Sequence, residues 1–161
     1  MADGIEFSIT GFDSLLGKLD AVSVDLRRKG GRAALRRAGN IIVEKAKTNA
    51  RRVDDPGTGR SIADNIAMRW NGRLFKRTGD LSFRIGVLHG AVLKKHPDFG
   101  KNAPTPHWRL IEFGTENVRA QPIMRPAAES SIGEVINTFG TEYEKAIDRA
   151  IKRAQKKGIP P

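Results

Sequence analysis

Apolar residues recur along this chain with two periods, and each period predicts one kind of element. Alternation at every second position predicts strands at residues 5–10, 66–70 and 81–88. Recurrence at every third or fourth position predicts helices at residues 13–22, 25–51 and 126–156. The pattern therefore predicts an α+β fold, with a small antiparallel sheet packed against long N-terminal and C-terminal helices in one domain, residues 1–161.

The two long helices carry glycines that bear on packing. Gly30-Gly31 interrupts the helix at 25–51, where each glycine costs about 1 kcal/mol relative to alanine. Gly133 and Gly140 lie on nearly the same face of the last helix and would permit another helix to approach closely. That last helix would be about 45 Å long. It is longer than a domain of this size needs, so we expect part of it to pack on another subunit.

Residues 107–129 connect the predicted sheet to the last helix. Four apolar side chains near its start are available for burial: Trp108, Leu110, Ile111 and Phe113. Gly114-Thr115 ends this segment, because glycine tolerates positive φ. Residues 116–125 are predicted to be extended, since residues that precede proline are biased away from the α region. Pro126 is predicted to be the first residue of the last helix.

Turns and loops divide the rest of the chain. Asn71-Gly72 and residues 77–80 predict turns between the two later strands, and residues 91–93 are expected to extend the sheet. Ser61 and Asp64 have the spacing of a capping box and predict a short helical turn. Residues 53–60 form a glycine-containing loop that lacks the lysine of a phosphate-binding loop. Residues 94–106 predict a flexible loop of a length typical of functional or disordered segments.

The charge of the chain points to anionic partners. Lysine and arginine exceed aspartate and glutamate by 29 to 18, which gives a net charge of +11. Arg28, Arg32 and Arg36, which we call the arginine ridge, recur every four residues and repel one another along one helix face. The ridge is either matched by an acidic partner or simply solvated, and the sequence favours neither. The candidate contacts for a polyanion or partner are Arg28, Arg32, Arg36, Arg37, Lys94 and Lys95.

No set of residues points to catalysis. There is no cysteine, and the three histidines lack the spacing of a metal site. The serines lie in no nucleophile motif, and Glu112 with Glu116 is too common a carboxylate pair to indicate a site. We expect a non-enzyme without metal or cofactor. The chain shows no signal peptide or membrane-spanning run, so we expect a soluble protein made inside the cell.

Residues 108–127 resemble a family of tail-completion or head–tail joining proteins, also called minor tail components, of lambdoid long-tailed bacteriophages. The family pattern is an aromatic residue, two spacers and (V/I)-E-F-G-T, a gap, then A-Q-P-F-(L/M)-R-P-A and a long helix. The chain matches it at Trp108, Ile111, Glu112, Phe113, Gly114, Thr115, Gln121, Pro122, Arg125 and Pro126, with Ile123 in place of phenylalanine. Residues 58–66 and 84–87 are similar to two weaker family segments.

The resemblance implies a structural virion protein at the neck of the phage, made in the bacterial cytoplasm. It implies a homo-oligomeric ring of six subunits that contacts tail-tube or tail-terminator and head-completion proteins. The motif residues are then expected to act in folding and assembly. The alternative is a nucleic-acid-binding protein that uses the basic helix face of residues 27–52, where phosphate contacts would dominate affinity. A combined hypothesis has basic groups lining a channel through which DNA passes.

Overall fold

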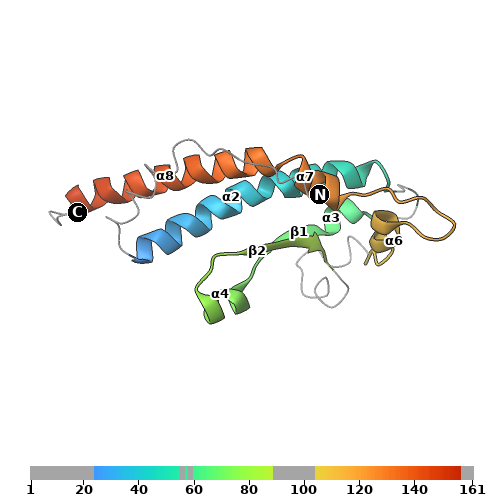
Figure 1. The fold of residues 1–161 in the computed structure, drawn as a ribbon, viewed down its shortest axis with the longest axis horizontal. Coiled ribbons are helices and arrows are strands. Elements are labelled where there is room, and N and C mark those ends of the chain that lie inside the picture. The colour runs from blue at the N-terminus through green and yellow to red at the C-terminus, as the bar shows by residue number, and fades with distance from the viewer. Residues whose placement is uncertain (1–23, 55–56, 58–59, 89–103, 157–161) are drawn as a thin grey trace, which may run out of the picture.

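Two long antiparallel helices form the body of the protein, and a β-hairpin covers one of them. The computed structural model describes residues 24–54, 57, 60–88 and 104–156. Helix α2 (Val24–Arg51) lies between α8 (Ile132–Lys156) on one side and the strands β1 (Ile66–Trp70) and β2 (Phe83–Val87) on the other (Figure 1). The predicted α+β architecture is therefore confirmed. The predicted elements at 5–10, 13–22 and 91–93, and most of the loop at 94–106, lie outside the described residues.

Helix α2 packs closely on both sides because glycine replaces larger residues along it. A Cβ on Gly30 would lie 3.1 Å from the Cβ of Ala146 on α8. A Cβ on Gly39 would lie 2.6 Å from the sulfur of Met68 on β1. By contrast, a Cβ on Gly133 or Gly140 would meet nothing within 4 Å. Within this chain the glycines that allow close approach therefore lie on α2, and the approach of another helix at Gly133 and Gly140 stays a prediction.

The two strands pair antiparallel, with Ile66 opposite Val87 and Trp70 opposite Phe83. Their connection is longer than the predicted turns, because α4 (Gly72–Thr78) lies between them. Asn71 caps this helix by accepting a hydrogen bond from the Leu74 amide at 3.3 Å. Gly79 ends the helix in the left-handed conformation, with φ of 80°. The turn dipeptide Asn71-Gly72 is thus a helix start, since the asparagine side chain serves either structure.

Two clusters make up the core. The larger lies where the second half of α2 meets the hairpin, α3 (Ile62–Asn65) and α7 (Met124–Glu129). Its buried members are Val43, Ala46, Ala50, Ile62, Ala63, Ile66, Ile123 and Ala127. The smaller cluster joins α2 to α8 through Ala34, Tyr143 and Ile147. Most of α8 is therefore used within the chain, and its length alone does not require a second subunit.

Short helix α3 follows the predicted capping pattern and has an additional cap. Ser61 accepts a hydrogen bond from the Asp64 amide at 3.1 Å, which confirms the predicted turn. The carboxylate of Asp54 accepts from the amides of Ile62 at 2.8 Å and Ala63 at 3.1 Å. Asp54 thus satisfies the first N–H groups of α3 and ties the end of α2 to the hairpin.

Candidate assembly site

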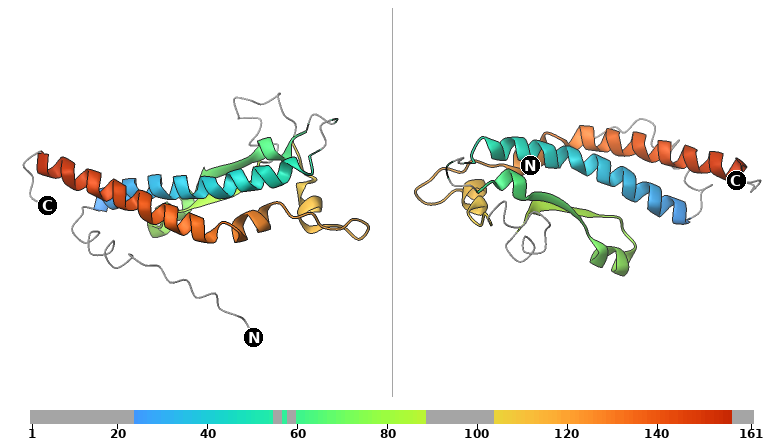
Figure 2. Two further views of the ribbon diagram at one scale, coloured as in Figure 1. Left: turned by 90° about the horizontal axis from the view of Figure 1, so that it is seen from above. Right: turned by 180° about the vertical axis from the view of Figure 1, so that it is seen from behind.

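Glu112 lies at the centre of residues 107–129, at the end of the molecule formed by α6 (Trp108–Phe113), α7 and the loop between them (Figure 2). Its side chain is only 2% exposed. One carboxylate oxygen accepts from the amides of Ile123 at 2.6 Å and Met124 at 2.9 Å, and the other from the amide of Arg125 at 3.1 Å. Glu112 therefore caps the N-terminus of α7 from another helix, where the helix dipole also favours a negative charge.

Pro126 completes this cap. The first N–H groups of a helix lack intrahelical partners, and Glu112 accepts three of them. Pro126 is the third residue of α7 and has no N–H to satisfy. The predicted helix start at Pro126 is therefore two residues late. The predicted extended conformation of Arg125 is also wrong, because the Glu112 carboxylate holds the Arg125 amide inside the first turn.

Arg125 closes the same contact from outside. Its Nε lies 3.3 Å from a Glu112 carboxylate oxygen, and its Nη2 donates to the Glu112 backbone carbonyl at 2.8 Å. Burial raises the pKa of Glu112, but the amides of Met124, Ile123 and Arg125 and the Arg125 guanidinium together lower it below its ordinary value. The carboxylate is thus held in its charged form by groups that belong to the next helix.

Gly114 makes the turn that brings α7 back to Glu112. It has a φ of 76°, and a Cβ there would lie 2.7 Å from the backbone nitrogen of Ala120 and 2.9 Å from the backbone oxygen of Val118. Two further backbone bonds brace the loop. The Thr115 amide donates to the Val118 carbonyl, and the Gln121 amide donates to the Ile111 carbonyl, each at 2.8 Å. Only glycine fits this position without displacing the loop backbone.

Helix α6 divides the predicted apolar residues between two surfaces. Trp108 and Ile111 pack against the larger core cluster, as predicted. Leu110 and Phe113 are 56% and 67% exposed, so their predicted burial is wrong. A helix presents only one side to the core, and on α6 that side also contains Glu112. Leu110 and Phe113 share the outer side, and Val118 in the adjoining loop is 58% exposed. We call these three residues the apolar patch.

Two residues at this site could not be identified from the motif. Val118 carries no motif signal and is an exposed residue of the loop that passes beside Gly114. Asn49 on α2 donates a hydrogen bond from its side-chain amide to the Ile123 carbonyl at 3.1 Å and so ties α7 to the body.

The last predicted helix is interrupted, since α7 ends at Glu129 and α8 begins at Ile132. Ser131 is buried at this break and donates its hydroxyl to the Ala127 carbonyl at 2.6 Å.

The arginine ridge lies over aromatic rings of the hairpin. The guanidinium carbon of Arg28 is 5.5 Å from the Phe75 ring centroid. That of Arg32 is 4.3 Å from the Trp70 ring, and that of Arg36 is 5.6 Å from the Phe83 ring. An arginine over an aromatic face is attracted to the ring electrons. The ridge therefore has aromatic neighbours inside the chain, while its three arginines remain exposed to solvent.

The other basic candidates are divided between paired and undescribed residues. Arg37 forms an ion pair with Glu142 on α8. Lys94 and Lys95 lie outside the described residues.

Within the described part of the chain, no group of three histidine, aspartate or glutamate side chains could hold a metal ion. Among those same residues, no helix has the length and apolar content needed to cross a membrane.

Comparison with known proteins identifies one family. A family model described as "Bacteriophage HK97-gp10, putative tail-component" matches residues 13–114. The match includes α2, the hairpin and α6, and it ends at the glycine turn. The second half of the resemblance, residues 120–127, lies beyond it. No curated protein and no solved structure matches the chain.

Proposed function

The chain belongs to the HK97-gp10-like family of bacteriophage tail components, and we propose that it completes the tail or joins head to tail at the neck. The family match is the observation that carries this proposal, since a tail component is a structural part of the virion. The motif at residues 108–127 supports the neck position, because it resembles that of tail-completion proteins. A structural role also fits Glu112, because its carboxylate accepts hydrogen bonds from three backbone amides of the next helix.

The proposed assembly is a ring of six copies between tail-tube or tail-terminator proteins and head-completion proteins. A ring forms when a surface of one copy binds a different surface of the next and the rotation closes. The apolar patch supports such a contact, because exposed clustered apolar side chains mark interaction sites. It is held in position by the Glu112 cap and the Gly114 turn, so it is presented in one geometry before assembly.

Removing two of the three side chains of the apolar patch is expected to abolish assembly without unfolding the protein. Leu110→Ser together with Phe113→Ser removes two exposed side chains, so the free energy of unfolding should change by less than about 1 kcal/mol. We expect complementation of a phage that lacks this gene to fall by at least about 100-fold, since central interface side chains cost about 2 kcal/mol or more each. Plaque counts and electron microscopy of the particles measure the effect.

Ile132→Ser is the matched control, because Ile132 is an exposed apolar residue outside the patch. It should complement as the wild type does. Normal particles from the double variant would rule out the patch as the assembly contact. Particles that carry complete heads and complete tails, joined without this protein, would rule out the neck function itself.

Nucleic-acid binding remains the alternative, and a salt titration separates it from the structural role. The arginine ridge favours the structural role, because its guanidinium groups already lie over Trp70, Phe75 and Phe83. We expect binding to a 30-base-pair duplex to be weaker than about 10 μM at ~0.15 M salt, within the range of non-specific contacts. A steep log–log salt slope with nanomolar affinity would instead support a DNA-binding protein. A weak, salt-sensitive contact is what DNA passing through a ring would make.

A further inference from the structure

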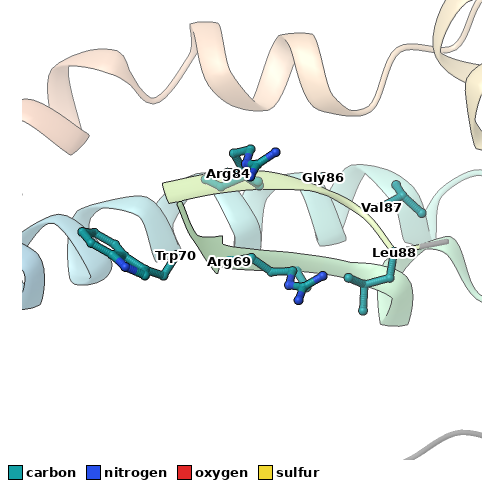
Figure 3. Close-up of a pocket in the computed structure, with 8 residues that line it drawn as sticks. Arg69, Trp70, Arg84, Gly86, Val87 and Leu88 are labelled. Carbon is teal, nitrogen blue, oxygen red and sulfur yellow. The ribbon is translucent and has the colours of Figure 1, made fainter. Parts of the chain in front are cut away.

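The hairpin has an open face that carries two opposed arginines. Side chains alternate across a strand, so Met68, Ile85 and their neighbours face α2 while Ala67, Arg69, Arg84 and Gly86 face away. Arg69 and Arg84 are direct cross-strand partners, and like charges in that position destabilise a sheet. Their side chains point toward opposite edges of the ribbon (Figure 3). Among the described residues, no carboxylate forms an ion pair with either arginine.

The outer edge of β2 offers backbone groups for another strand. The Leu88 amide donates to the Asn65 carbonyl at 2.8 Å, and the Asn71 amide to the Ser82 carbonyl at 3.0 Å. In an antiparallel pair every second residue bonds to the partner strand, so these two bonds imply that Arg84 and Gly86 also bond to β1. The backbone N–H and C=O groups of Phe83, Ile85 and Val87 then point away from β1. Within residues 24–54, 60–88 and 104–156, the sheet has two strands and no third strand covers this edge. Free edges are normally paired, covered or blocked.

A hollow of about 330 Å³ lies against both strands of the hairpin and includes the whole length of β2 from Arg84 onward. It is lined by the consecutive residues 84–88 and by Ala67, Arg69 and Trp70. Because consecutive strand residues point to opposite faces, a hollow that touches all of 84–88 must run along the strand. Ser82, directly before β2, has a buried hydroxyl oxygen without a hydrogen-bond partner. The space and the unpaired groups therefore lie along the same strand.

One segment of the chain matches both faces of this edge. Residues 5–10 alternate Ile5, Phe7 and Ile9 with Glu6, Ser8 and Thr10. As a third strand, the first set would continue the apolar face that packs on α2, and the second would continue the arginine face. The segment is also acidic in a basic chain, since residues 1–16 contain Asp3, Glu6 and Asp13 and no lysine or arginine. Both the acidic charge and the two-residue alternation of residues 5–10 therefore match the outer edge of β2.

We propose that residues 5–10 of the same chain bind along the outer edge of β2 as a third strand, with Glu6 beside Arg84. Residues 11–23 can span up to about 43 Å when extended, which is similar to the length of α2 at about 42 Å. The segment can therefore reach β2 from the start of α2. A tethered segment also has an effective concentration in the millimolar range, which favours it over the same segment of another copy. This inference does not depend on the proposed place in the virion.

The surface suits an acidic strand better than a nucleic acid. Binding of single-stranded nucleic acid uses aromatic side chains on which bases stack. The aromatic rings of the hairpin, at Trp70, Phe75 and Phe83, already have arginine side chains over them. The open face carries the guanidinium of Arg69 and that of Arg84, which donates one hydrogen bond to the Asn71 side-chain oxygen at 3.2 Å. These groups lie beside outward-facing strand amides, a combination that an extended acidic peptide satisfies.

Amide hydrogen exchange, followed residue by residue by NMR on the full chain, tests the proposal. We expect the amides of Ile85 and Val87 to exchange at least about tenfold faster in the Phe7→Pro, Ile9→Pro double variant than in the wild type. The amides of Arg84 and Gly86 should change much less, because they point toward β1. Equal exchange of Ile85 and Val87 in the two proteins would overturn the proposal.

Charge reversal tests the pairing of Glu6 with Arg84. Glu6→Arg should raise exchange at Ile85, and adding Arg84→Glu should restore slow exchange. Arg77→Glu on α4 is the matched control and should not restore it. Failure of rescue by Arg84→Glu would overturn the assigned neighbour. A mixing experiment tests whether the segment comes from the same chain. The isotope-labelled proline variant is mixed with unlabelled wild type, and exchange is followed on the labelled protein. If its Ile85 and Val87 amides became slow again, another copy would supply the segment, and the same-chain assignment would be wrong.

Discussion

Glu112→Ala is expected to lower the free energy of unfolding by about 3 kcal/mol. The change leaves the amides of Ile123, Met124 and Arg125 without their acceptor, and each unsatisfied buried group costs about 1–3 kcal/mol. Water can reach part of the site once the side chain is gone, which keeps the total near the lower end. For a chain of this size the melting temperature should fall by about 6–12 °C. Thermal and urea unfolding followed by circular dichroism measure both quantities.

Glu116→Ala is the matched control for this prediction. Glu116 is the carboxylate four residues further along, and it is exposed. Its removal should change stability by no more than about 0.5 kcal/mol. If the two alanine variants lost equal stability, the cap formed by Glu112 would not be what holds α7 in place.

The Glu112 cap also predicts a dependence of stability on pH. The folded state holds the pKa of Glu112 below the ordinary value of 4.5. A carboxyl group with a lowered pKa contributes stability that is present above pH 4.5 and is lost as the pH falls through its folded pKa. The difference in stability between wild type and Glu112→Ala should therefore shrink as the pH is lowered below 4.5. A constant difference from pH 7 down to pH 3 would contradict the charged cap.

Gly114→Ala is expected to cost about 3–4 kcal/mol. A non-glycine residue at positive φ costs about 1–3 kcal/mol by itself. The new Cβ would also lie 2.7 Å from the Ala120 nitrogen and 2.9 Å from the Val118 oxygen, so the loop backbone would have to move. That movement would displace Val118 and so disturb the apolar patch. Equilibrium unfolding and the complementation assay should therefore both detect the change.

Gly79→Ala is the control that separates the cost of a positive φ from the cost of steric overlap with the new Cβ. Gly79 has a φ of 80°, close to the 76° of Gly114, but a Cβ there would meet nothing within 4 Å. Gly79→Ala should therefore lower the free energy of unfolding only by the cost of the positive φ, about 1 kcal/mol. Equal losses at the two glycines would show that the contacts of the 114–123 loop contribute nothing to the requirement at Gly114.

Local pattern predicted much of the architecture and part of the site. The 3.6-residue period identified α2 within one residue at each end and located α8, which begins at Ile132, six residues after its predicted start. The period of two identified β1 and β2 with ends correct within two residues. The cap at Ser61 followed from spacing alone. At residues 107–129 the pattern located the glycine turn but placed the helix start two residues late. Proline bias is a local preference, and the Glu112 carboxylate overrode it at Arg125 with a contact from thirteen residues away.

The sequence by itself determined which side chains this protein can bury, where its main elements lie and which phage family it belongs to. Those properties follow from neighbours within a few residues and from a motif that can be read directly. Only the tertiary structure decided which partner each polar group meets. Glu112 meets the amides of α7, and the arginine ridge meets aromatic rings of a hairpin that lies about forty residues further along the chain. Such pairs form through space, so the residues around each group do not indicate its partner. For the same reason, only the fold could place Leu110 and Phe113 on the outside of α6 while the charged Glu112 is buried.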